Sequence, residues 1–119
     1  MIIALWILTG LLAVAFVGAG TMKALRPHAA LAGNMPWVED VTPPQLKAIG
    51  ILELLGGLGL VLPAATGILP WLTPVAAFAL TVTMGVAVAL HVKRSEGFVP
   101  SLVLGILSAV VGVGWIVLG

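Results

Sequence analysis

Long apolar segments separated by short polar stretches are the dominant pattern of this chain. The apolar runs are continuous rather than alternating, which indicates helices rather than membrane strands. At 1.5 Å per residue, a helix of about 20 apolar residues crosses a hydrocarbon core roughly 30 Å thick. The pattern therefore predicts four membrane-spanning helices, at about residues 2–22, 45–62, 71–92 and 98–118.

Prolines set the expected limits of the middle helices. Thr42-Pro43-Pro44 is a helix-start signal, because a threonine caps the first turn and a proline is tolerated within it. Pro63 is expected to end the second helix, and Pro63 to Pro70 then forms a short hairpin linker. Residues 24–44 form the longest loop, where Trp37 lies in an apolar patch next to acids. That patch is either a short interfacial segment or a plain connector.

Composition supports a single all-α transmembrane domain over residues 1–119. Hydrophobic residues make up 61% of the chain and charged residues 8%, more apolar surface than a soluble core of this size can hide. Lipid solvates such a surface if helices satisfy the backbone. A secretory signal peptide is the rival interpretation of the first segment, but that segment has no basic start and is long for one.

The basic residues predict an orientation in the membrane. They flank the first and third loops, whereas the second loop and both ends of the chain carry none. By the positive-inside rule, the first and third loops are cytoplasmic and both termini lie outside. The net charge of +1, without a basic patch, predicts no binding of nucleic acid, and the absence of cysteine excludes thiol chemistry by this chain alone. The basic residues are Lys23, Arg26, Lys47, Lys93 and Arg94.

Glu53 is the most informative residue, because it is the only Asp, Glu, Lys or Arg between Lys47 and Lys93. It shares a helix face with Gly50 and Gly57, which allow close helix approach, so this face is expected to point into the bundle. Its place in the helix puts it roughly 13 Å below the cytoplasmic surface. Burial there disfavours the carboxylate unless a cation or several donors stabilise it. Glu53 is therefore a functional group or a structural acid bonded to another helix.

Other polar residues are candidates for the same site. Thr81 and His91 share a face of the third helix, and Lys23 closes the first helix at the level of His91. Together with Glu53 they are expected to line a cavity open to the cytoplasm, although Lys23 also suits a topology-setting charge. Ligation of haem by His28 and His91 is a weaker alternative. No metal site is predicted.

Several segments, taken together in their order and spacing, carry a resemblance to a known family. They are Gly20 to Leu25, Pro36-Trp37, Ile49 to Leu60, Pro63 and Met84 to His91. With them the chain resembles the DoxX-like family of small bacterial four-helix membrane proteins. The resemblance implies a four-helix bundle in the bacterial inner membrane, and it places the family's polar positions at Lys23, Glu53 and His91. Relatives in this family include a subunit of a thiosulfate:quinone oxidoreductase, a membrane component associated with oxidative-stress and sulfur-transfer enzymes and, more distantly, eukaryotic membrane chaperones for receptor assembly.

Three functions compete on this basis. The first is a redox-accessory subunit without independent catalytic activity, which holds a quinone or similar lipid while Glu53 and His91 exchange protons. The second is an assembly or interaction protein, acting on partner membrane enzymes or as a homo-oligomer, in which Glu53 is structural and the small residues of the first and fourth helices form the contact. A small transporter is third, because four spans are few for alternating access. No covalent cofactor is predicted, and membrane lipids are expected partners.

Overall fold

The computed structural model describes residues 1–26 and 41–118 and shows a bundle of four helices. All four are long and apolar enough to cross a membrane. The sequence prediction of a four-helix membrane bundle is therefore confirmed. The helices are α1 (Ile2–Leu25), α3 (Pro43–Thr66), α4 (Leu72–Lys93) and α5 (Val99–Leu118).

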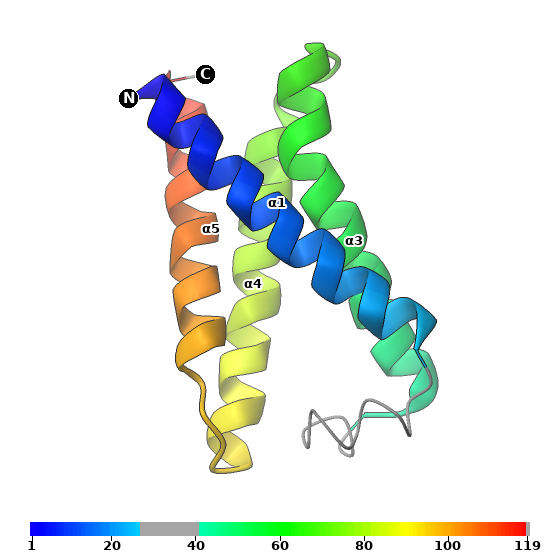
Figure 1. The fold of residues 1–119 in the computed structure, drawn as a ribbon. Coiled ribbons are helices and arrows are strands. Elements are labelled where there is room, and N and C mark those ends of the chain that lie inside the picture. The colour runs from blue at the N-terminus through cyan, green and yellow to red at the C-terminus, as the bar shows by residue number, and fades with distance from the viewer. Residues whose placement is uncertain (27–40, 119) are drawn as a thin grey trace.

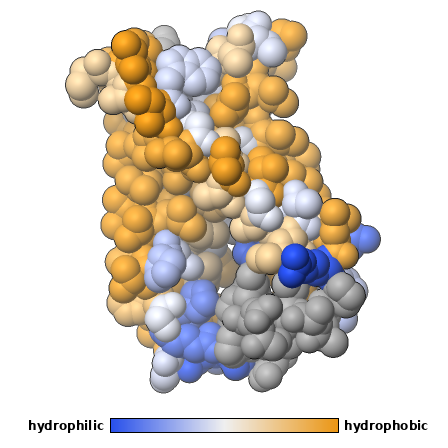
Figure 2. Space-filling view, in the orientation of Figure 1, coloured by the Kyte–Doolittle hydropathy of each residue, from blue (hydrophilic) through white to orange (hydrophobic). Residues whose placement is uncertain are grey.

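The helices pack as two pairs, α1 with α3 and α4 with α5 (Figure 1). The start of α1, the end of α5 and the α3–α4 connection lie at one end of the bundle, whereas the end of α1, the start of α3 and the α4–α5 connection lie at the opposite end. We call the latter the loop end. Figure 1 shows the two pairs diverging toward it. Figure 2 shows apolar atoms over most of the surface and hydrophilic ones gathered at the loop end, the arrangement expected of a protein in a bilayer.

The start of α3 confirms the capping signal read from the sequence. The Gln45 amide donates to the Thr42 hydroxyl (3.3 Å), and the Thr42 amide donates to the Gln45 side chain (2.9 Å). This reciprocal capping box satisfies two backbone donors that a helix start leaves without partners. Pro43 and Pro44 fit in the same turn because the first turn needs no amide donors.

The predicted end of this helix at Pro63 is wrong. Pro63 lies inside α3, which continues to Thr66 and ends at Gly67 in the left-handed conformation (φ 72°). A proline removes only one backbone donor, and membrane helices tolerate that loss. The true stop is Gly67, whose amide donates to the Pro63 carbonyl (3.0 Å), because glycine adopts positive φ without a steric cost. The connection to α4 is correspondingly shorter than predicted.

The core lies between the pairs, toward the end where the termini meet. Thr9 of α1 is fully buried there and accepts a hydrogen bond from the Trp115 indole (3.0 Å). The Trp115 ring also meets Trp6 edge-to-face, with ring centroids 4.9 Å apart. These contacts join α1, the first helix of the chain, to α5, the last one. The buried apolar side chains of this core are Leu5, Leu12, Ala13, Phe16, Leu60, Ala77, Leu80, Met84 and Val111.

The Thr9–Trp115 contact gives a first prediction. Thr9→Val keeps the shape of the side chain but leaves the indole donor of Trp115 without its acceptor. We expect the free energy of unfolding in detergent to fall by about 1 kcal/mol. Thr83→Val is the control, because Thr83 bonds only within its own helix among the hydrogen bonds of the described residues. An equal loss in both variants would contradict a role for the interhelical bond.

Candidate functional site

The site begins where α1 and α3 cross. A Cβ atom on Gly20 would lie 2.5 Å from the Gly50 carbonyl oxygen, and one on Gly50 would lie 2.6 Å from the Ala24 amide nitrogen. Both obstacles are backbone atoms, which no rotamer change can move. Only glycine therefore fits at these two positions, and the two backbones approach as closely as small residues permit in membrane helices.

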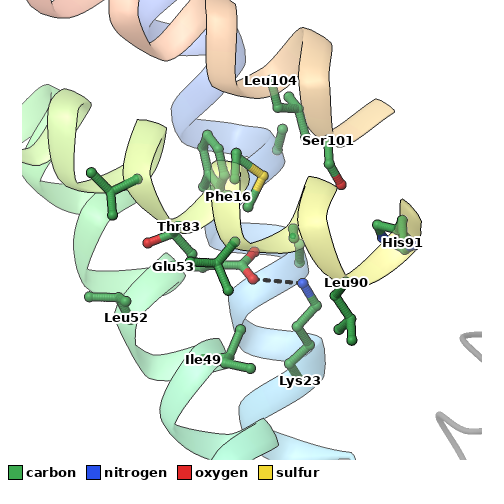
Figure 3. Close-up of a pocket in the computed structure, with 16 residues that line it drawn as sticks. Phe16, Lys23, Ile49, Leu52, Glu53, Thr83, Leu90, His91, Ser101 and Leu104 are labelled. Atoms are coloured by element: carbon green, nitrogen blue, oxygen red, sulfur yellow. Dashed lines mark hydrogen bonds and ion pairs between the residues drawn. The ribbon is translucent and has the colours of Figure 1, made fainter. Parts of the chain in front are cut away.

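This crossing brings Lys23 to Glu53. Each lies three residues after a crossing glycine, Lys23 after Gly20 and Glu53 after Gly50. Side chains of a helix tilt toward its N-terminus, and α1 and α3 run in opposite directions, so the two side chains lean toward the same level. The Lys23 ammonium donates to Glu53 Oε1 at 2.6 Å (Figure 3). The sequence left open whether these residues meet, and the backbone geometry decides that they do.

Both partners of this ion pair are buried. The side chain of Glu53 is 2% exposed and that of Lys23 is 12% exposed. Buried charges of this kind persist only when they are paired and hydrogen-bonded. Lys23 is thus more than a topology-setting charge. The predicted inward face of α3 is also confirmed, because Gly50 and Gly57 are buried beside Glu53.

The ion pair forms part of the wall of a cavity of about 490 Å³, which we call the central cavity. Its volume falls within the usual range for small-molecule sites, about 300–1,000 Å³. All four helices contribute, and most of the lining is apolar. The polar lining side chains are Lys23, Glu53, Thr83, His91 and Ser101, and the apolar ones are Ala15, Phe16, Ala19, Ile49, Leu52, Val82, Met84, Val86, Ala87, Leu90 and Leu104.

Comparison with known proteins gives the family. The model of the DoxX-like family matches residues 7–114, which is nearly the whole chain and all four helices. This chain belongs to the DoxX-like family. Comparisons with curated proteins and with solved structures gave no match. Family membership, together with four apolar helices, establishes a multi-pass membrane protein.

His91 lies at the loop end of the DoxX-like cavity, near the C-terminus of α4. Its Nδ1 is 3.5 Å from Glu96 Oε1, while Glu96 Oε2 accepts from Arg94 Nε at 3.1 Å. The Glu96 amide also donates to the His91 carbonyl (2.8 Å), so the turn after α4 holds the acid beside the ring. In the view of Figure 3, His91 and the Lys23–Glu53 pair occupy different parts of the lining. Glu96 was not among the residues predicted, because only the turn after α4 brings it back to His91.

Thr81 is the one predicted site residue that does not line the central cavity. Its hydroxyl donates to the Ala77 carbonyl (3.0 Å) and lies 3.4 Å from the Gly105 carbonyl oxygen, so Thr81 belongs to the α4–α5 contact. Thr83 lines the cavity instead. The sequence alone does not distinguish Thr81 from Thr83 as the lining residue, because more than one face of α4 contacts other helices.

Ser101 is a further polar residue in the lining of the central cavity, and it belongs to the small residues of the fourth helix that the sequence suggested for helix contacts. Other members of the same stripe do pack, since Gly105 lies against Met84 and Gly112 against Phe78. Ser101 lies in the first turns of α5, at the loop end, where the helix pairs diverge. Its contribution to the cavity lining therefore comes from where it lies along α5.

Two earlier interpretations fall outside the described residues. They are the role of His28 and the segment around Trp37. Within residues 1–26 and 41–118, no three His, Cys, Asp or Glu side chains gather as metal ligands would.

Proposed function

We propose that this DoxX-like protein binds a quinone, or a lipid with a similar small polar head, in the central cavity and serves a partner redox enzyme. The observation that carries the proposal is the buried Lys23–Glu53 pair in the wall of a largely apolar cavity of about 490 Å³. Ligand sites commonly combine an apolar lining with a few placed polar groups. This cavity has that composition.

The polar groups suit a quinone head. The Lys23 ammonium lies in the cavity wall, where it donates to Glu53, and an ammonium N–H is a suitable donor to a quinone carbonyl. Glu53 lines the same cavity, and its carboxylate is a suitable acceptor for the hydroxyl of a quinol. Ser101 offers a further hydroxyl from α5.

The division of labour follows from the same chemistry. Reduction of a quinone to a quinol takes up two electrons and two protons. In the proposal, the partner enzyme supplies the electrons, and this chain supplies the binding site and the proton-exchanging groups. An imidazole can both accept and donate a proton, and His91 lies where the cavity nears the loop end. We propose that this end faces the bacterial cytoplasm, because the basic residues flank both of its connections.

Mass spectrometry of organic extracts tests the proposal. We expect purified wild-type protein to yield a quinone or one defined lipid in near-stoichiometric amount, and Glu53→Gln to yield much less. The double variant Lys23→Met with Glu53→Leu should also lose the ligand, because it replaces the polar pair by apolar groups of similar size. Lys93→Met is the matched control, since Lys93 is exposed and lies outside the cavity lining.

One observation favours the assembly function as a second candidate. Lys23 and Glu53 satisfy each other within the chain, as a purely structural pair would. Among the small residues of the first and fourth helices, Gly105 and Ser108 do not suit a partner contact, because both are buried inside the bundle, whereas Gly18 on α1 is exposed. Equal extracts that contain only bulk phospholipid would support assembly, through partner enzymes or a homo-oligomer, over ligand binding.

A further inference from the structure

A second apolar cavity, of about 300 Å³, lies between α3 and α4. It differs from the central cavity in having no charged side chain in its lining. Leu52 lines both cavities, so they adjoin at this residue. The remaining lining residues are Leu55, Gly56, Gly59, Pro63, Leu72, Val75, Ala76, Ala79 and Leu80.

On α3, five of the seven residues that line the two cavities follow one stripe. From Ile49 the lining continues through Leu52 and Gly56 to Gly59 and Pro63, at alternating steps of three and four residues. This is the spacing of one helix face. The stripe spans fourteen residue steps, which corresponds to roughly 21 Å of helix. The two cavities thus lie one after the other along the same face of α3, with Leu52 between them.

A matching stripe follows α4. Val75, Ala79, Val82 and Val86 recur at steps of four, three and four, the first two lining the second cavity and the last two the central cavity. All four are exposed in the bundle and therefore face lipid. Small residues line the path where the two helices come close, since a Cβ on Gly59 would lie 3.0 Å from the Ala76 Cβ. We call the path between the two stripes the α3–α4 groove.

We infer that the α3–α4 groove holds the isoprenoid tail of a quinone whose ring occupies the central cavity beside Lys23 and Glu53. The inference rests on the proposed function. It adds that the ligand is a ring with one long apolar tail, and it says where that tail lies. A tail attached to a ring in the central cavity must leave the bundle. The groove lets it leave beside Leu52 and run toward Pro63 without separating any packed helices.

The groove contributes little hydrophobic free energy to the binding of the tail. A tail in lipid is already in an apolar medium, so placing it in the groove gains packing rather than a hydrophobic free energy. The groove therefore acts mainly as a passage. Blocking it should weaken the binding of a tailed quinone and leave the tail-less ring analogue unaffected.

The experiment measures both compounds in nanodiscs of one phospholipid composition. Ala79→Trp places a large side chain in the groove at an exposed position, and Ala89→Trp places one at an exposed α4 position outside both cavities. We expect Ala79→Trp to raise the Kd of the long-tailed quinone about tenfold, the effect of a modest steric cost. The Kd of the tail-less ring analogue should stay at the wild-type value, and Ala89→Trp should change neither. Each compound partitions equally into all discs, so partitioning cancels between variants.

The outcomes separate the two proposals. If the tail-less analogue binds, depends on Glu53, and Ala79→Trp affects the tailed quinone no more than Ala89→Trp does, the groove inference is overturned and the proposed function stands. If neither compound binds wild-type protein, both fail. If Ala79→Trp changes only the oligomeric state in analytical ultracentrifugation, the groove is a contact between copies of this chain. Val75→Trp, at another exposed position of the same stripe, must repeat the result for the inference to hold.

Discussion

Lys23→Met is expected to lower the free energy of unfolding by about 3–5 kcal/mol, because it leaves the buried Glu53 carboxylate without its cation. Glu53→Leu should cost a similar amount by leaving the ammonium of Lys23 without its carboxylate. The double variant, Lys23→Met with Glu53→Leu, removes both charges and should recover most of the loss, since apolar groups of similar volume often replace a buried pair at little cost. The measurement is a double-mutant cycle from unfolding curves in mixed detergent, followed by circular dichroism.

The cycle also separates stability from function. A folded double variant that has lost its ligand would show that the pair is there to bind, since stability alone does not need it. Lys93→Met should leave stability unchanged, because Lys93 is an exposed residue at the end of α4. Single variants as stable as wild type would contradict a buried ion pair in the membrane protein.

Gly50→Ala is the second change with a large expected effect. The new Cβ would lie 2.6 Å from the Ala24 amide nitrogen and 2.7 Å from the Gly20 carbonyl oxygen. Because these are backbone atoms, α1 and α3 must move apart, and we expect a loss of about 1–3 kcal/mol in the free energy of unfolding. The same displacement should lengthen the Lys23–Glu53 contact and reduce the quinone or lipid recovered from purified protein.

Gly18→Ala is the matched control for this substitution. Both glycines lie inside helices, so alanine improves helix propensity by up to about 1 kcal/mol in each case. A Cβ on Gly18 would meet nothing within 4 Å, so only the favourable contribution remains. Unfolding curves of the two variants in the same detergent should therefore shift in opposite directions. A shared shift would show that the α1–α3 crossing is looser than the structure indicates.

The effects expected for the Lys23–Glu53 variants and for Gly50→Ala have the same structural origin, the crossing of α1 and α3. Gly20 and Gly50 set the distance between α1 and α3, and that distance decides whether the side chains three residues later can meet. The pairs α1–α3 and α4–α5 diverge toward the loop end (Figure 1). The central cavity is lined by all four helices, and the Lys23–Glu53 pair that the crossing brings together forms part of its wall.

The amino-acid sequence alone determined the four spans, the fold class and the inward face of α3. These follow from local properties: the length of each apolar run, the capping box at Thr42, and the spacing of Gly50, Glu53 and Gly57 along one helix. Each property is read within a single helix, and the bilayer imposes the rest by requiring satisfied backbones. The limit at Pro63 was misjudged because proline permits a membrane helix to continue until a residue such as Gly67 ends it.

Only the tertiary structure decided which side chains meet. That Lys23 reaches Glu53 depends on the distance and rotation of two helices, which periodicity along one helix does not contain. Helix rotation decides that Thr83 rather than Thr81 lines the central cavity, and that Leu52 lines both cavities. The turn after α4 decides that Glu96 approaches His91. The polar residues of the site are visible in the sequence, but their arrangement is a property of how the helices pack.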